Sequence, residues 1–174
     1  MEPDLKPVFS PEEIRETVER IAGEIEADYA SKDPLLIGVL KGAFIFLSDL
    51  VRAVKLPLDA DFVQTTCYGK RDIPSSEVIV TRDISAEIKG RDIIIVEGII
   101  DRGHTARALI EYFGTKGPSS IRLCALLMRK STPADIKADY VGMRIDEGFI
   151  VGYGMDYKEH YRGLPGLYMV APEK

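Results

Sequence analysis

Apolar residues recur along the chain in two patterns, one typical of an amphipathic helix and one typical of buried strands. Between residues 14 and 29 they follow the helical period, and Ser10, Pro11 and Glu13 in front of them form the signature of a helix start with a capping box. Other runs are apolar on both faces, which indicates strands buried in a sheet. The predicted strands are 35–40, 93–96 and 121–128, with weaker ones at 58–65 and 77–81, and the further predicted helices are 43–54 and 104–113.

Strands that alternate with helices predict an α/β fold, with a twisted, parallel-rich sheet flanked by helices on both faces. The polar segment 67–76 and the segment 97–103 are expected to be loops. From about residue 139 to 174 the strand signals are shorter and glycines are frequent, which predicts a small C-terminal hood over the sheet edge. We expect residues 1–174 to form a single domain.

Composition narrows the function. The chain has 174 residues and a net charge of −5, which argues against general binding to nucleic acid or to a membrane surface. Two cysteines cannot form a disulfide framework, and two distant histidines make a zinc site unexpected. The longest apolar runs are far shorter than a bilayer span and the N-terminus is charged and proline-rich, so the cytoplasm is the expected compartment.

The candidate chemistry lies where predicted strands end, because ligands of open α/β sheets bind at the carboxyl ends of the strands. The richest of these ends is 97–105, since Gly103 allows a close backbone approach, Thr105 offers a hydroxyl and the next helix presents free N–H groups to a phosphate. Glu97 and Asp101 beside this cradle suit sugar hydroxyls or a proton. A plainer interpretation, with the glycines as turn residues and Asp101 as a helix cap, stays open on composition alone.

Residues 94–105, Ile-Ile-Val-Glu-Gly-Ile-Ile-Asp-Arg-Gly-His-Thr, resemble the phosphoribosyl-pyrophosphate motif of type I phosphoribosyltransferases. Further segments resemble the same family in its own order, and more narrowly its hypoxanthine-guanine branch. They are 40–43 for an early pyrophosphate loop, 61–69 for the strand into a mobile catalytic loop, 139–142 and 149–157 for a purine-binding hood, and 161–162 for a late arginine. Several motifs in one order cover nearly all of the chain and make the resemblance specific.

The resemblance implies the fold of that family and a role for each residue that matches its motifs. Asp101 would be the catalytic residue, which takes or gives the proton at purine N7. The ribose and its 5-phosphate would be held by Glu97, Asp101, Arg102, Gly103, His104 and Thr105, with no chemistry assigned to the His104 side chain. Pyrophosphate would be bound by Lys41, Gly42 and Arg162, the purine by Arg129, Phe149 and Ile150, and Mg²⁺ by Asp156 and Glu97, with Cys67 and Tyr68 in the mobile loop. The peptide bond before Lys41 is expected to be strained or cis.

Some positions depart from the family's pattern. Gly98 stands where the family has the second residue of an acidic pair, and Arg102 replaces a small hydroxyl residue. Arg129 replaces the purine-reading lysine when the strand is aligned without a gap, whereas Lys130 takes that role if the register slips by one residue. Because a missing carboxylate weakens the hold on the ribose, Gly98→Asp is expected to tighten binding of phosphoribosyl pyrophosphate, provided that the backbone tolerates a side chain.

Taken singly, several of these residues have plainer interpretations. Phe149 could be ordinary core, Asp156 and Arg162 could form a surface ion pair of negligible energy, and Lys41 could be a solvated turn residue. Taken together and in this order, they favour the resemblance.

The function that the resemblance implies is purine salvage, in which hypoxanthine or guanine and phosphoribosyl pyrophosphate give IMP or GMP and pyrophosphate, with Mg²⁺ as cofactor. The alternative is a protein of the same fold, weak or inactive in catalysis, that senses a nucleotide or phosphoribosyl pyrophosphate. Xanthine specificity also stays open. The expected partners are these small molecules and further copies of the chain in a homodimer or homotetramer, with no nucleic acid and no membrane.

Overall fold

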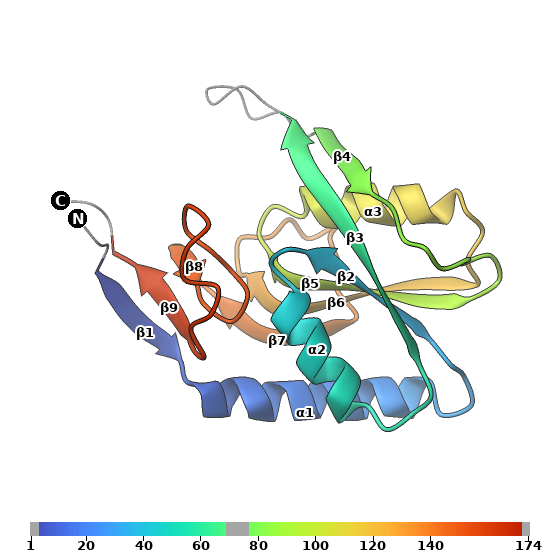
Figure 1. Cartoon of the computed structure of the whole chain (residues 1–174), viewed down its shortest axis with the longest axis horizontal. Coiled ribbons are helices and arrows are strands. Elements are labelled where there is room, and N and C mark those ends of the chain that lie inside the picture. Colours follow the sequence, from blue (N-terminus) through green and yellow to red (C-terminus); the bar gives the residue numbers. More distant parts are fainter. Residues whose placement is uncertain (1–3, 69–76, 172–174) are drawn as a thin grey trace.

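A central sheet organises the molecule (Figure 1). The structure, a computed structural model, describes residues 4–68 and 77–171, and within them this sheet has six strands. They are β2 (Leu35–Leu40), β3 (Asp59–Tyr68), β4 (Glu77–Arg82), β5 (Asp92–Ile100), β6 (Ser120–Arg129) and β7 (Tyr140–Ile145). Their order is β4-β3-β2-β5-β6-β7, and all neighbours are parallel except β4, which runs antiparallel to β3. The predicted parallel-rich α/β sheet is confirmed.

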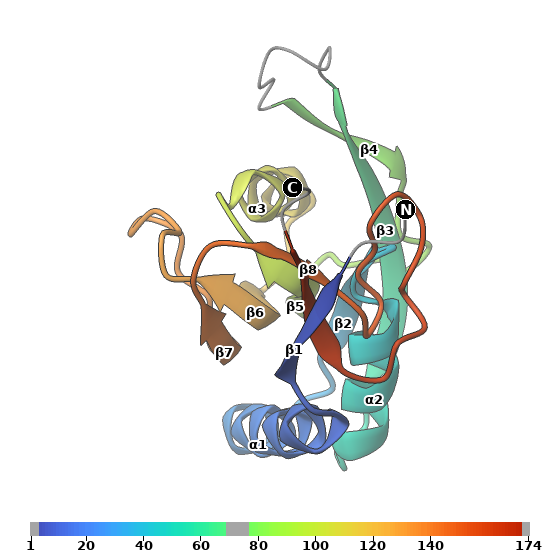
Figure 2. The ribbon, with the colours of Figure 1, turned by 90° about the vertical axis from the view of Figure 1, so that its left-hand side faces the viewer.

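Helices cover both faces of the sheet. α1 (Pro11–Asp28) and α2 (Phe44–Ala53) lie on one face, and α3 (His104–Gly114) lies on the other (Figures 1 and 2). Alternate residues of β5 pack to opposite sides, with Ile94 in the core that includes α1 and α2 and Ile95 in the core that includes α3. No helix in the described part of the chain is long and apolar enough to cross a bilayer.

The first helix begins where the sequence predicts. The Ser10 hydroxyl accepts a hydrogen bond from the backbone N–H of Glu13 at 3.2 Å, and the Glu13 carboxylate accepts one from the backbone N–H of Ser10 at 2.8 Å. The predicted capping box is therefore confirmed.

The strand β5 is longer than predicted. It runs through Glu97 to Ile100, where the sequence predicts a loop. The reason is backbone pairing with β6, which the low strand propensity of a Glu-Gly pair does not reveal.

Two residues expected in the mobile loop, Cys67 and Tyr68, lie in a strand. Cys67 and Tyr68 are the last residues of β3 and pair with Val78 and Glu77 of β4. They therefore lie in a strand rather than in a loop, because β4 folds back along the end of β3. The rest of the predicted loop 67–76 lies outside the described residues.

The hood is a smaller antiparallel sheet. Within the described chain it has three strands, β1 (Leu5–Phe9), β8 (Phe149–Val151) and β9 (Leu167–Val170), in the order β1-β9-β8 (Figure 1). The hood differs in two respects from the stretch expected to form most of it, about 139 to 174. β7 belongs to the central sheet because it pairs with β6, and β1 joins the hood because its hydrogen-bond partner is β9.

Candidate active site

Three parallel strands bring their carboxyl ends to one edge of the central sheet. β2 ends just before Lys41, β5 ends just before Asp101, and β6 ends at Arg129. Because β2 and β6 flank β5, these residues meet although they lie far apart in the sequence. The peptide bond between Leu40 and Lys41 is cis, as the family resemblance implies.

A cavity of about 200 Å³, which we call the α3 pocket, lies between the end of β5 and the start of α3. Gly103 precedes the helix with a φ of +74°, no side chain caps the helix, and its first turn carries no acidic residue. The first N–H groups of α3 are therefore available to an anion at the positive end of the helix dipole. All six residues predicted to hold the ribose and its 5-phosphate line this pocket, namely Glu97, Asp101, Arg102, Gly103, His104 and Thr105.

Glu97 is the buried acid of the α3 pocket. The residue is only 8% exposed, and among the described residues its carboxyl group has no hydrogen-bond or ion-pair partner. Burial without a partner disfavours the charged form and raises the pKa of Glu97 to about 8. At neutral pH the carboxyl group is therefore mostly protonated and can donate a hydrogen bond to a ligand.

A second cavity of about 340 Å³, which we call the hood pocket, lies between the sheet edge and the hood. It is lined by Lys41, Gly42, Ile99, Asp101, Arg129, Phe149, Ile150, Met155, Asp156 and Arg162. Every residue predicted to bind the purine or pyrophosphate is among them. The two pockets share Ile99 and Asp101, so the side chain of Asp101, which is 63% exposed, stands where they adjoin.

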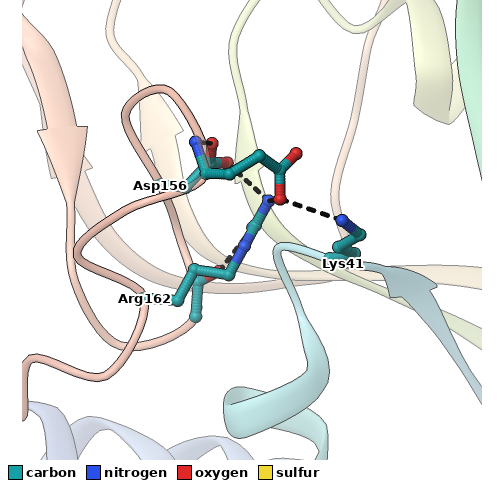
Figure 3. Close-up of polar contacts among 5 residues, drawn as sticks. Lys41, Asp156 and Arg162 are labelled. Carbon is teal, nitrogen blue, oxygen red and sulfur yellow. Dashed lines mark hydrogen bonds and ion pairs between the residues drawn. The ribbon is translucent and has the colours of Figure 1, made fainter.

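A network of charged side chains lies on the wall of the hood pocket (Figure 3). Arg162 forms an ion pair of 2.8 Å with Asp156 and donates a hydrogen bond of 2.9 Å to the carbonyl oxygen of Gly154. The Glu159 carboxylate bridges two cations, with Nζ of Lys41 at 2.9 Å and a guanidinium nitrogen of Arg162 at 3.2 Å. The Asp156–Arg162 pair is half-buried, with 29% and 19% of the side chains exposed, so it is not the fully exposed surface pair that the sequence left open.

The backbone carbonyl of Gly42 is enclosed by two other glycines. A Cβ atom at Gly98 would lie 2.8 Å from the Gly42 oxygen, and one at Gly154 would lie 2.6 Å from it. Ordinary contacts of a Cβ atom begin at 3.4 Å, and a backbone carbonyl cannot swing away as a flexible side chain can. The condition for Gly98→Asp to tighten binding is therefore not met, and Gly98 has a structural reason to be glycine.

Arg129 lies in the hood pocket and is held on three sides. The residue is 8% exposed, and its two terminal guanidinium nitrogens donate hydrogen bonds to the carbonyl oxygens of Asp146 and Gly148. Its Nε lies 3.4 Å from a carboxylate oxygen of Asp101. Lys130 points elsewhere, is exposed and pairs with the Asp146 carboxylate at 2.9 Å. The alignment without a gap, which matches Arg129 to the purine-reading position, is thus the one that brings a cation to the pocket. The same guanidinium group also stabilises the turn before β8.

Phe149 is not core, because it is 52% exposed on the wall of the hood pocket. Its ring meets Tyr157 edge to face, with the ring centres 5.4 Å apart. The neighbouring Ile150 is buried and also lines the hood pocket. An exposed aromatic face beside a cavity can stack on a flat ligand.

The sequence did not identify two contributors to the site. Glu159 joins Lys41 to Arg162, and the only sequence signal for it is the spacing of three residues that separates Asp156, Glu159 and Arg162. The hydroxyl of Thr132 donates a hydrogen bond of 2.7 Å to the carbonyl oxygen of Asp101 and so braces the turn between β5 and α3.

Known proteins resemble this chain over nearly its whole length. Residues 10–158 match the family model described as phosphoribosyl transferase domain. The hypoxanthine-guanine phosphoribosyltransferase of Bacillus subtilis is 41% identical over 96% of this chain and 93% of its own, and that of Aquifex aeolicus is 38% identical over 95% and 94%. A solved structure of a hypoxanthine-guanine phosphoribosyltransferase from Bacillus anthracis matches with a TM-score of 0.92 and 36% identity, covering 98% of this chain and 100% of that one. The chain therefore belongs to the phosphoribosyltransferase family, in the branch of the hypoxanthine-guanine phosphoribosyltransferases.

Proposed function

We propose that this protein transfers the phosphoribosyl group of phosphoribosyl pyrophosphate to hypoxanthine or guanine, which gives IMP or GMP and pyrophosphate. One observation carries the proposal beyond family membership. The α3 pocket, which suits a phosphate, and the hood pocket, which offers an aromatic face and three cations, adjoin at a single carboxylate, Asp101. A transfer between a sugar phosphate and a flat base needs these two sites side by side.

The α3 pocket suits the ribose 5-phosphate. The free N–H groups at the start of α3 would bind the phosphate, and the hydroxyl of Thr105 would add a hydrogen bond. The buried Glu97 would face the ribose hydroxyls, since a protonated carboxyl group both donates and accepts hydrogen bonds. Binding a neutral hydroxyl also removes the cost of an unpartnered polar group.

The hood pocket suits the purine and pyrophosphate. Phe149 would stack on the base, and the Ile150 backbone would recognise its edge. Arg129 would face a 6-oxo group, because a guanidinium only donates hydrogen bonds and an exocyclic amine offers no good acceptor. Lys41 and Arg162 would bind pyrophosphate, whose negative charge grows as it leaves.

Asp101 would hold the proton at N7 of the purine. Its carboxylate is exposed at the border of both pockets, so it can reach a base bound in one and a sugar bound in the other. The Nε of Arg129 on one side and the hydroxyl of Thr132 behind its carbonyl keep this turn in place. A positioned carboxylate of this kind acts as general acid or base.

Magnesium fits the site as a companion of the substrate. Within the described residues no group of three or more His, Cys, Asp or Glu side chains is arranged to hold a metal. Mg²⁺ is commonly held by one or two carboxylates together with substrate phosphates, and Asp156 offers a carboxylate beside Lys41 and Arg162. Asp156 would hold the ion, which neutralises charge on the leaving pyrophosphate. Glu97, also expected from the sequence to bind Mg²⁺, lines the α3 pocket with a raised pKa, and a protonated carboxyl group is a poor ligand for the ion.

A spectrophotometric assay tests the proposal. The protein is incubated with phosphoribosyl pyrophosphate, Mg²⁺ and hypoxanthine, guanine, xanthine or adenine in turn. We expect turnover with hypoxanthine or guanine and little with adenine. Binding of IMP without turnover of any base would refute the enzyme and support the nucleotide-sensing alternative, whereas turnover of xanthine alone would correct the base. Cytoplasmic location and assembly as a dimer or tetramer stay predictions. Analytical ultracentrifugation would measure the oligomeric state.

A further inference from the structure

Two cations that line the hood pocket are already paired with an anion that belongs to the chain. The Glu159 carboxylate lies 2.9 Å from Nζ of Lys41 and 3.2 Å from a guanidinium nitrogen of Arg162, through the same oxygen atom. Figure 3 shows Lys41 and Arg162 reaching toward each other from β2 and from the hood. These are the two cations that the proposed function assigns to pyrophosphate.

Stability does not explain this contact. The Glu159 side chain is 68% exposed and that of Lys41 is 54% exposed, and ion pairs of such exposure contribute little to folding. The loop that carries the carboxylate also has three residues with left-handed backbone, since φ is +53° at Lys158, +67° at Glu159 and +73° at Tyr161. This conformation is unfavourable for residues other than glycine.

The charge balance points to a role in binding. Lys41 and Arg162 contribute two positive charges, and Asp156 and Glu159 contribute two negative ones, so the network is neutral. Asp156 is more buried and also accepts a hydrogen bond of 2.8 Å from the backbone N–H of Glu159. Glu159 is the exposed acid of the two, and its side chain can turn into solvent, which frees Lys41 and leaves Arg162 paired with Asp156 alone.

We propose that the Glu159 carboxylate is an internal stand-in for a diphosphate, which neutralises Lys41 and Arg162 in the free protein and is displaced when pyrophosphate or phosphoribosyl pyrophosphate binds. The inference rests on the proposed function for the identity of the anion. Its consequence is weaker binding of the product, because each bound pyrophosphate has to displace two ion pairs. The device favours release of pyrophosphate over its retention.

Calorimetric titration with inorganic pyrophosphate and Mg²⁺ tests the proposal without any need for turnover. Glu159→Gln removes the charge and keeps the shape, and Glu16→Gln on the exposed face of α1 makes the same change of net charge away from the site. We expect Glu159→Gln to bind pyrophosphate about 2- to 10-fold more tightly than the wild type, the effect of losing two exposed ion pairs. Glu16→Gln should bind as the wild type does, and high salt should shrink the difference.

The opposite results are equally clear. Unchanged or weaker binding by a Glu159→Gln protein with a wild-type melting curve would overturn the proposal, because Glu159 would then be inert or would position the two cations. Glu159→Ala controls for hydrogen bonds that the amide of Gln could form, and it should behave as Glu159→Gln does. Tighter binding by the variant in a protein without transferase activity would refute the proposed function alone. Absence of pyrophosphate binding in every variant would refute the pyrophosphate site together with this inference.

Discussion

A methyl group at Gly98 should damage the active site more than the fold. Gly98 lies in β5, next to the buried Glu97, and a Cβ atom there would sit 2.8 Å from the carbonyl oxygen of Gly42. To reach an ordinary contact of 3.4 Å, the Gly42 carbonyl and the strand have to separate by about 0.6 Å. Gly98→Ala therefore pushes the turn that presents Lys41 away from β5, although Gly154 encloses the same carbonyl oxygen.

The magnitude follows from this displacement. Inserting one carbon into a close-packed region costs about 1–3 kcal/mol of stability, and we expect the lower half of that range because the turn lies at the rim of the sheet. A misplacement of about 1 Å can cost about 100-fold in rate, so roughly 0.6 Å should lower kcat/KM for phosphoribosyl pyrophosphate by about 10-fold. Gly98→Asp makes the same clash, so the acid expected at this position from the family resemblance should lower kcat/KM rather than raise it.

Steady-state kinetics and thermal melts measure the two effects on the same samples. The matched control is Gly23→Ala, because Gly23 lies inside α1 and a Cβ atom there would meet nothing within 4 Å. That change should raise stability by about 0.5–1 kcal/mol and leave kinetics unchanged. Wild-type kcat/KM in a folded Gly98→Ala protein would refute the steric argument, and a tighter-binding Gly98→Asp would restore the expectation drawn from the sequence.

Three further changes probe individual groups. Asp101→Asn should lower kcat by about 10²–10⁴-fold while IMP still binds in a calorimeter, because an amide cannot take up the N7 proton, and wild-type turnover would exclude that role. Arg129→Lys should raise the KM for hypoxanthine about 10-fold, because one ammonium group cannot hold the carbonyl oxygens of both Asp146 and Gly148, and an unchanged KM would show that this turn needs no such brace. Burial raises the pKa of Glu97 to about 8 from its ordinary value of 4.5, so between these values the folded protein keeps a proton that the unfolded chain has lost, and the free energy of unfolding falls as pH rises. Glu97→Gln should remove this fall, which is at most about 5 kcal/mol. The free energy of unfolding is measured from denaturant curves at several pH values, and an equal dependence on pH in both proteins would contradict the assignment.

The framework of the fold could be predicted from the sequence because its signals are local. Ser10, Pro11 and Glu13 mark the start of α1 within a few residues, and short apolar runs indicate the buried strands. The loop at Gly103 is also local, since a glycine between a strand and a helix positions the phosphate cradle by itself.

The parts that the sequence missed depend on contacts between distant segments. β1 is a strand only because β9 pairs with it, and a strand with Lys6 and Pro7 in its middle has little signal of its own. In the sequence Gly98 suggests only that a carboxylate is missing, because the close approach of the Gly42 carbonyl oxygen is visible only in the structure. The contact between Lys41 and Glu159 spans 118 positions, and no local pattern can predict such a pair.

The strand order of the hood has a consequence for synthesis on the ribosome. β8 carries Phe149 and Ile150, and it pairs with β9, which is made later and in turn pairs with β1. The six strands described in the central sheet have all been made once Ile145 has emerged, so this sheet can fold before the partner of β1 is available. The purine side of the site is thus assembled last, when residue 170 leaves the exit tunnel. A nascent chain stalled before that point can already have a phosphate cradle but no wall against which a base could stack.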